Sequence, residues 1–316
     1  MDLQKINNKI EKIYKRFVKT SIWYKLIIAL ALIFLGNVII KTINNKTEGF
    51  ENNVGPKEKF VEKTKVEDIY DKEYSDIYDN LVLNGLKIDY ELGKILEIMG
   101  NKNKRVLDVG CGTGDHIGKL SNLNVECTGL DLSPNMINKA KEKYPKVNYD
   151  VGDVDNSMRY VGDSFDGVLC LYFTIYYMKN KRQFFDNIYK WLKPGGMLFL
   201  HLVDREKFDT LMNISNPIGL INIQDYVKNR ITDSVAEFKD FSYKAKFNLN
   251  GRNTTFEETF KYKSGNIRKN IHNLDMESQK TILSYAKETG FVLHKTIDLG
   301  NTKYNNEYMY VLKKKD

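Results

Sequence analysis

The apolar and polar positions divide the chain into an N-terminal apolar run and a long alternation of strand-like and helix-like patterns. Residues 22–40 carry one charge, on Lys25, and residues 41–65 are polar. From residue 66 onward, apolar residues recur first at helical spacing and then in short continuous runs. Short apolar runs that alternate with helical patterns predict parallel strands joined by helices.

Two helical patterns come first, over residues 66–82 and 86–99, the second closed by Gly100. After them, five strands alternate with three helices. The strands are expected at 105–109, 125–131, 147–151, 165–171 and 197–203, and the helices at 115–122, 134–143 and 181–192. Ser133 and Pro134 give the clearest helix start, because a serine hydroxyl caps a helix and proline suits the first helical position.

Residues 204–273 interrupt this alternation with a β-rich insertion. Apolar and polar residues alternate from residue 241 to 249, and the Asn250-Gly251 pair after them predicts a hairpin turn. Further strands are expected at 252–260 and 267–273, a helix at 275–289, and a last strand pair at 291–299 and 308–312. The short connection within that pair permits only antiparallel pairing. We therefore expect a doubly wound α/β fold, with a mostly parallel seven-stranded sheet and an antiparallel last strand.

The N-terminal apolar run is expected to be a transmembrane helix over residues 22–40. Its nineteen residues rise about 28 Å as a helix, close to the roughly 30 Å of a hydrocarbon core. Trp23 and Tyr24 suit a membrane interface. The expected organisation is a basic tail (1–21), this anchor, a polar linker (41–65) and one domain (66–316). A buried soluble helix or a cleaved signal peptide are the alternatives, although no small-x-small cleavage site follows the run.

The segment from Arg105 to His116 carries the strongest chemical signal. A strand pattern ends in Gly110, Gly112 and Gly114, and a helix pattern follows. Such a glycine turn lets a ligand approach the backbone at a helix N-terminus, as in nucleotide-binding corners. Asp108 lies just before the glycines, and its carboxylate would repel a phosphate. The corner therefore favours a cationic ligand without phosphate, such as S-adenosylmethionine.

Residues 66–315 resemble the class I S-adenosylmethionine-dependent methyltransferases. Residues 106–114 are similar to the first motif of that family, 129–133 to the second and 152–154 to the third. Residues 166–170 resemble its fourth strand, and 191–199 its turn into the fifth. The resemblance implies S-adenosyl-L-methionine as cofactor and no metal. The cofactor-binding residues that it implies are Asp108, Gly110, Cys111, Gly112, Gly114, Asp131, Leu132, Asp153, Val154 and Cys170.

Several of these assignments have structural alternatives. Asp131 is expected to hold the ribose hydroxyls through its two acceptor oxygens, but it could instead cap the following helix. Asp153, with the N–H of Val154, is expected to contact adenine, although Asp150 and Asp155 compete with it. Cys111 is expected to be a packed small residue rather than a nucleophile. His116, at the start of a helix, is expected to be solvated.

The substrate side is less defined, and no catalytic base is identified. The loop after strand four offers Tyr172, Tyr176 and Tyr177 as substrate-side candidates, for stacking on a planar acceptor or facing a cation. It lacks the Asn/Asp-Pro-Pro motif of the family members that methylate DNA or protein amides. The insertion 204–273 is where small-molecule members place a substrate cover. Its polar candidates, which could equally be solvated strand residues, are Arg252, Glu257, Glu258, Arg268 and His272.

These patterns favour a membrane-anchored methyltransferase that acts on a small-molecule or lipid-like acceptor. The net charge of +8 and the pI near 9.0 also suit an anionic polymer. An RNA (cap-type) or protein methyltransferase is therefore one alternative, although no basic cluster with interleaved aromatics supports nucleic acid. A non-enzymatic adaptor that retains the fold is another. The acceptor atom, the particular membrane and the oligomeric state stay open.

The expected membrane orientation rests on two conflicting signals. Six basic residues and two acidic ones precede the apolar run, and two of each follow it, which favours a cytoplasmic N-terminus. Cys111, Cys127 and Cys170 have no pairing pattern and indicate a reducing compartment. A tail of 21 residues can be translocated, so we expect a single-pass membrane protein whose catalytic domain lies in the cytosol.

Overall fold

The computed structural model describes residue 21 and residues 59–210 and 230–316. The chain divides into compact units of residues 1–57 and 58–316, and the description below concerns the second. The expected membrane anchor, residues 22–40, lies outside the described residues. Among the described helices, none combines the length and apolarity that crossing a membrane requires.

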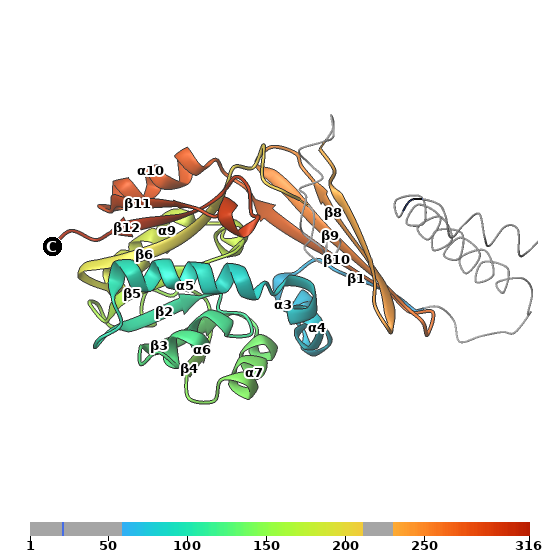
Figure 1. The fold of residues 1–316 in the computed structure, drawn as a ribbon, viewed down its shortest axis with the longest axis horizontal. Coiled ribbons are helices and arrows are strands. Elements are labelled where there is room, and N and C mark those ends of the chain that lie inside the picture. Colours follow the sequence, from blue (N-terminus) through green and yellow to red (C-terminus); the bar gives the residue numbers. More distant parts are fainter. Residues whose placement is uncertain (1–20, 22–58, 211–229) are drawn as a thin grey trace, which may run out of the picture. The chain divides into compact units, whose positions relative to one another are not determined.

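A seven-stranded sheet forms the centre of the second unit (Figure 1). Its order is β11-β12-β6-β5-β2-β3-β4. The neighbouring strands β6, β5, β2, β3 and β4 run parallel to one another. β12 pairs antiparallel with both β6 and β11. The expected mostly parallel sheet with an antiparallel last strand is confirmed. The strand bounds are β2 (Arg105–Val109), β3 (Glu126–Asp131), β4 (Asn148–Val151), β5 (Phe165–Cys170), β6 (Leu192–Val203), β11 (Val292–Asp298) and β12 (Glu307–Lys313).

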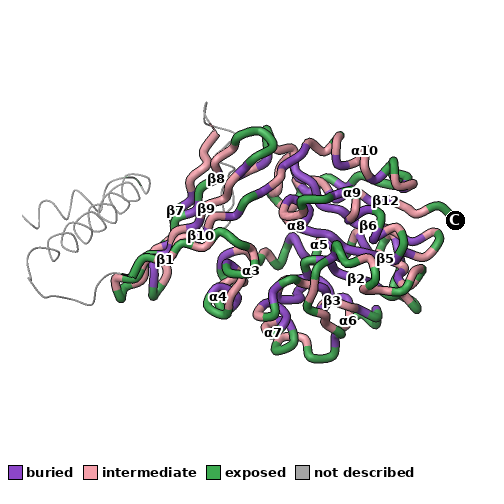
Figure 2. Tube along the Cα trace, turned by 180° about the vertical axis from the view of Figure 1, so that it is seen from behind, coloured by how far each residue is buried: buried purple, intermediate pink, exposed green. Residues whose placement is uncertain are grey.

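Helices cover both faces of this sheet. On one face, α5 (Gly85–Met99), α6 (Asp115–Ser121) and α7 (Pro134–Lys143) share a buried apolar cluster with the strands. On the other, α9 (Lys181–Trp191) and α10 (Gln279–Thr289) share a second cluster that includes Trp191 and Phe184. Buried residues follow the central strands in Figure 2, while many turns are exposed. The core therefore lies on both sides of β2 and β5.

The predicted start of α7 is confirmed in detail. The Ser133 hydroxyl accepts a hydrogen bond from the N–H of Met136 at 3.2 Å, and Pro134 takes the first helical position. Gly100, at φ 73°, ends α5 as expected. Local signals of this kind fix the helices on either side of the glycine corner.

Strands of the insertion and residues 60–63 together form a second sheet of five strands in the order β1-β10-β9-β8-β7. Its bounds are β1 (Phe60–Lys63), β7 (Asp233–Glu237), β8 (Phe241–Asn248), β9 (Asn253–Tyr262) and β10 (Ile267–Asp275). Three expectations need correction. Residues 60–63 were expected in a linker but pair parallel with β10, β7 was not expected, and the helix expected from residue 275 begins at Gln279.

A pair of short helices lies between the two sheets (Figure 1). The single helix expected over 66–82 is in fact α3 (Val66–Ile69) and α4 (Lys72–Val82), separated at Asp71, whose carboxylate caps α4 by accepting from the N–H of Tyr74. Tyr74 packs with Phe260 of the insertion sheet, and α4 also contacts α7. Two further elements are α8 (Thr174–Tyr177) and the 3-10 turn η3 (Gly300–Thr302).

Candidate active site

The glycine corner lies where the strand order of the large sheet reverses. β2 pairs with β3 on one side and β5 on the other, so its carboxyl end opens at the switch point of the sheet. Gly110, Gly112 and Gly114 have φ of 70°, 55° and 81°, values that side chains other than glycine rarely adopt. A Cβ on Gly110 would lie 2.5 Å from the methyl carbon of Thr174. The corner therefore requires its glycines.

A cavity of about 50 Å³ lies at this corner. Asp108 and Asp115 are its acidic residues, and no lysine or arginine is among the described residues that line it. The Asp115 carboxylate accepts from Lys143 at 2.6 Å, whereas Asp108 is buried at the end of β2. An acidic lining of this kind fits a cationic group, such as the sulfonium or the ammonium of S-adenosyl-L-methionine. The lining residues are Tyr78, Val82, Leu83, Ile88, Asp108, Gly110, Cys111, Gly112, Thr113, Asp115, His116, Leu171 and Tyr172.

Asp108 is buried at the end of β2, at 3% exposure. Its pKa is raised to about 7: burial is the main cause, His116 opposes the shift, and nearby Asp131 and Glu91 add to it. A neighbouring positive charge would lower the pKa of this buried carboxyl, because the charge stabilises the ionised form. The pocket is thus electrostatically prepared for a cation.

Asp131 ties the second motif to the glycine corner. Its Oδ2 accepts from the N–H of Gly112 and its Oδ1 from the N–H of Ser133, both at 2.9 Å. Burial raises the pKa of Asp131, and these backbone donors oppose the shift. Each carboxylate oxygen retains a further lone pair. Asp131 can therefore hold the turn through these backbone donors and still accept hydrogen bonds from the ribose hydroxyls.

The remaining motif residues lie in different surroundings. Asp153 is exposed, and its carboxylate accepts from the N–H of Asp155 at 2.9 Å. Val154 is buried, with its carbonyl accepting from Asn187, while Leu132 is 37% exposed. Cys170 is fully buried in β5 and lines neither cavity.

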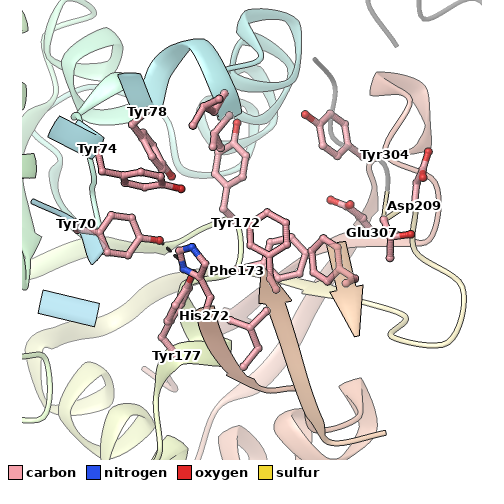
Figure 3. A pocket seen from close by; sticks show the side chains of 16 residues that line it. Tyr70, Tyr74, Tyr78, Tyr172, Phe173, Tyr177, Asp209, His272, Tyr304 and Glu307 are labelled. Carbon is pink, nitrogen blue, oxygen red and sulfur yellow. Dashed lines mark hydrogen bonds between the residues drawn. The ribbon is translucent and has the colours of Figure 1, made fainter. Parts of the chain in front are cut away.

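A second, larger cavity of about 130 Å³ adjoins the first. Tyr78, Val82 and Tyr172 line both cavities and form their common wall. No lysine or arginine is among its described lining residues. An engineered cavity of about 150 Å³ holds benzene, so this one accommodates a ring-sized body. It is lined by Tyr70, Tyr74, Tyr78, Leu81, Val82, Tyr172, Phe173, Tyr177, Asp209, Thr210, Phe247, Phe256, His272, Leu274, Tyr304 and Glu307 (Figure 3).

The three substrate-side candidates do not share one environment. Tyr172 and Tyr177 line the larger cavity. Tyr176 does not: it is fully buried, and its hydroxyl accepts from the N–H of Val203 at 2.9 Å. The structure therefore corrects the candidate set, because Tyr176 supports the core between α8 and β6.

The insertion contributes His272 to this cavity. Its Nδ1 lies 2.8 Å from the Tyr177 hydroxyl, and its Nε2 lies 2.8 Å from Oε2 of Glu258. The other polar candidates of the insertion are engaged elsewhere: Arg252 with Asp275, Glu257 with Asn248 and Lys269, and Arg268 with Asp71, Glu73 and the carbonyl of Ile69. Of the insertion candidates, the structure brings only the Glu258–His272 pair to the site.

A buried charged cluster lies beside the common wall. Lys87 Nζ is 3.7 Å from Glu91 and 3.5 Å from Glu307, and it lies 4.1 Å from the ring centroids of Tyr172 and Tyr304. His116 Nε2 lies 2.9 Å from Glu91. His116 was expected to be solvated, but it is buried and lines the smaller cavity. Glu91 lies on α5 and reaches His116 on α6, so local spacing could not reveal this pair.

Tyr70, Tyr74 and Tyr78 are site residues that sequence reasoning did not select. Their spacing was visible as one face of a helix, which is typical of core residues. In the structure that face lines a cavity, and Tyr70 Oη lies 3.1 Å from Tyr177 Oη. The pattern identified the face but not what lies opposite it.

Comparison with known proteins agrees with this geometry. Residues 106–196 match a family described as methyltransferase domain. The dTDP-4-amino-2,3,4,6-tetradeoxy-D-glucose N,N-dimethyltransferase of Saccharopolyspora spinosa is 30% identical over 136 residues, 41% of this chain and 54% of that protein. A ubiquinone biosynthesis O-methyltransferase of Xanthomonas oryzae pv. oryzae is 32% identical over 127 residues, 39% of this chain and 51% of that protein. The chain thus spans about half the length of these two relatives.

Solved structures resemble a larger share of the chain. An S-adenosylmethionine-dependent methyltransferase from Clostridium acetobutylicum superposes with a TM-score of 0.59 at 18% identity, over 77% of this chain and 98% of that one. The S-adenosylmethionine-bound amino pentose methyltransferase CalS10 from Micromonospora echinaspora gives a TM-score of 0.57 at 20% identity, over 78% and 98%. At these identities the likeness shows the fold.

The sheet order and the glycine corner are those of the fold of the class I, S-adenosylmethionine-dependent methyltransferases. Within this fold, residues 106–196 are similar to the methyltransferase-domain family. The cofactor of this class is S-adenosyl-L-methionine. The corner fits this cation because Asp108 and Asp115 line it and no lysine or arginine is among its described lining residues.

Proposed function

We propose that this protein transfers a methyl group from S-adenosyl-L-methionine to the nitrogen of a small-molecule amine held in the larger cavity. The observation that carries the proposal is the lining of that cavity. Most of its side chains are aromatic, its acidic residues are Asp209 and Glu307, and no lysine or arginine is among the described lining residues. Aromatic faces attract cations, and Asp209 adds a carboxylate, whereas Glu307 is already 3.5 Å from the buried Lys87. A phosphate inside the cavity would meet no lysine or arginine among the described lining residues.

The position of the cavity supports a transfer role. Residues lining the glycine corner would hold the cofactor, and an acceptor in the larger cavity would lie next to it across the common wall of Tyr78, Val82 and Tyr172. The cofactor supplies the methyl group and the leaving sulfur. The tyrosines hold the amine and exclude water, and positioning of this kind is worth about 7–11 kcal/mol.

Two of the relatives act on amino sugars by name, and another is named as an O-methyltransferase. The cavity chemistry favours the amine. The test is methyl transfer from isotopically labelled cofactor to three ring-sized probes: cyclohexylamine, cyclohexanol and cyclohexyl phosphate. Transfer to the amine alone is expected, and transfer to the phosphate but not the amine would contradict the proposal.

We extend the proposal to the membrane on the sequence alone. Residues 22–40 would anchor the protein, with residues 66–316 on the cytosolic side. The apolar length and the interfacial Trp23 and Tyr24 support an anchor, and the unpaired cysteines support the cytosolic side. Protease digestion of intact vesicles checks the orientation: protection of the C-terminal domain in cytosol-side-out vesicles would contradict it.

A further inference from the structure

A chain of hydrogen bonds runs from the larger cavity to a fully buried carboxylate. Tyr70 Oη lies 3.1 Å from Tyr177 Oη, Tyr177 Oη lies 2.8 Å from His272 Nδ1, and His272 Nε2 lies 2.8 Å from Glu258 Oε2. Tyr70, Tyr177 and His272 line the cavity, whereas Glu258 is 0% exposed behind them. Figure 3 shows the first three side chains gathered on one side of Tyr172 and Phe173, with Tyr304 and Glu307 on the other.

The surroundings of Glu258 keep it ionised. Tyr243 donates to its Oε1 at 2.7 Å and Asn270 to its Oε2 at 3.1 Å. Burial alone would raise the pKa of Glu258, but hydrogen bonds from His272, Tyr243 and Tyr74 outweigh it and lower the pKa. An ionised carboxylate only accepts hydrogen bonds, so Nε2 of His272 must carry a proton.

The direction of the remaining bonds follows. When His272 is neutral and protonated at Nε2, its Nδ1 is an acceptor, and the Tyr177 hydroxyl donates to it. The Tyr177 oxygen can then accept from Tyr70 or from a ligand. When His272 is doubly protonated, the Nδ1 bond reverses and Tyr177 becomes the acceptor. The same four side chains therefore accommodate one extra proton without moving.

We propose that this chain removes the proton from a cationic amine acceptor. It rests on the proposed function, because the amine must first bind in the cavity. An N–H of the ammonium donates to the Tyr177 oxygen while Tyr177 passes its own proton to Nδ1 of His272. The freed nitrogen lone pair forms the new C–N bond, and the electrons of the broken C–S bond stay on sulfur. The proton remains on His272, balanced by Glu258, until it leaves to solvent.

The tyrosines transmit this proton rather than keep a charge. Burial raises the pKa of Tyr70 and of Tyr177 above the usual value for tyrosine, so neither becomes a phenolate near neutral pH. His272 is the imidazole that lines the larger cavity among the described residues: His116 lines the smaller one, His201 is fully buried and lines neither, and His294 is exposed. The titratable side chains that face His272 or its carboxylate are Glu258, Tyr70, Tyr74, Tyr177 and Tyr243.

Two ring-sized probes separate this role from a structural one. Cyclohexylamine is protonated at neutral pH and must lose a proton before attack, whereas aniline is already neutral. In the full-length protein, Tyr177→Phe and His272→Gln should lower kcat for cyclohexylamine about 10²–10⁴-fold, the range of general acid–base catalysis, with a much smaller loss for aniline. The cyclohexylamine rate of His272→Gln should also recover as the pH rises. His294→Asn, on the exposed histidine, is the matched control and should behave as wild type.

Equal losses on both probes, in variants that still bind S-adenosylhomocysteine by calorimetry, would overturn the relay. Tyr177→Phe removes only a hydroxyl, so it keeps the test valid if His272→Gln fails to fold. If the wild-type protein binds S-adenosylhomocysteine but methylates neither probe, the amine acceptor of the proposed function fails instead.

The relay itself is then decided without an acceptor. Nitrogen-15 NMR of the histidine rings should show neutral His272 protonated at Nε2. A neutral ring protonated at Nδ1 would overturn the relay.

Discussion

The backbone N–H of Gly112 donates a hydrogen bond to Oδ2 of Asp131 over 2.9 Å. This single bond joins the glycine turn after β2 to the end of β3. The cofactor corner is therefore held in shape by a residue expected to bind the cofactor as well.

Replacing Asp131 by alanine should remove cofactor binding. The change deletes the acceptor of two backbone donors, Gly112 and Ser133, together with the expected ribose contact. Hydrogen bonds to charged groups are worth about 1.5–3 kcal/mol, so the affinity for S-adenosylhomocysteine should fall at least about 100-fold in calorimetry. Asp89→Ala, on an exposed aspartate of α5, is the control. Unchanged affinity in Asp131→Ala means that the cofactor binds elsewhere.

Valine at Gly112 should have the same effect for a different reason. The φ of 55° at this position is strained for any residue with a Cβ and most of all for a β-branched one. A Cβ there would find space, 3.5 Å from Met136, so the backbone and not a clash carries the effect. Gly85→Val, at a helical glycine with a negative φ and nothing within 4 Å of its Cβ, is the matched substitution. Retained S-adenosylhomocysteine affinity in Gly112→Val would contradict the assignment.

Cofactor affinity should depend on the protonation of Asp108. Its pKa near 7 leaves the carboxyl partly neutral at neutral pH, and a cationic ligand favours the ionised form. Binding should therefore weaken up to about tenfold per pH unit below 7 and level off above it. Calorimetry with S-adenosyl-L-methionine from pH 6 to 8 measures this, and Asp108→Asn should remove the dependence. A flat wild-type profile would show that Asp108 does not sense the ligand.

The same residue should cost stability in the absence of ligand. A carboxyl whose folded-state pKa is raised favours folding only at low pH, and that contribution is lost as the pH rises through about 7. Asp108→Asn should therefore raise the melting temperature more at pH 8 than at pH 5. An equal effect at both pH values would contradict the raised pKa.

Lys87 should be essential to the fold rather than to transfer. Replacing it by methionine leaves Glu91 and Glu307 buried without their shared cation. Removing one partner of a buried ion pair costs about 3–5 kcal/mol, which denaturant unfolding can measure. Lys72→Met deletes a lysine that is 83% exposed and paired with Asp76, and should cost under about 1 kcal/mol. Similar losses in the two variants would mean that the buried cluster adds nothing.

Local chemistry made much of the large sheet predictable. β2 and α7 have the expected bounds because their signals, an apolar run before glycines and a Ser-Pro start, are contained in a few residues. β1 could not be found in this way. Its partner β10 lies about 200 residues away, and Phe60 is 60% exposed, so no local apolar pattern marks the strand.

The candidate site also has a part that the sequence predicts and a part that it does not. The glycine corner and Asp131 were predictable because the turn and the strand end constrain the residue type. The cavity was not, since Tyr70 and His272 come together from segments that share no pattern in the sequence. Tyr172 and Tyr176 are equally aromatic, but only the structure separates the one in the cavity from the one in the core.

The parallel pairing of β1 with β10 has a practical consequence. Residues 60–63 cover the outer edge of the strand that carries His272, in register from Ile267 to Asn270. A chain shortened to begin at residue 66, where the helical pattern starts, would leave that edge open. Open strand edges invite pairing with other chains. We therefore expect a fragment that begins before Phe60 to stay monodisperse. A fragment that begins at residue 66 should aggregate through the open edge of β10.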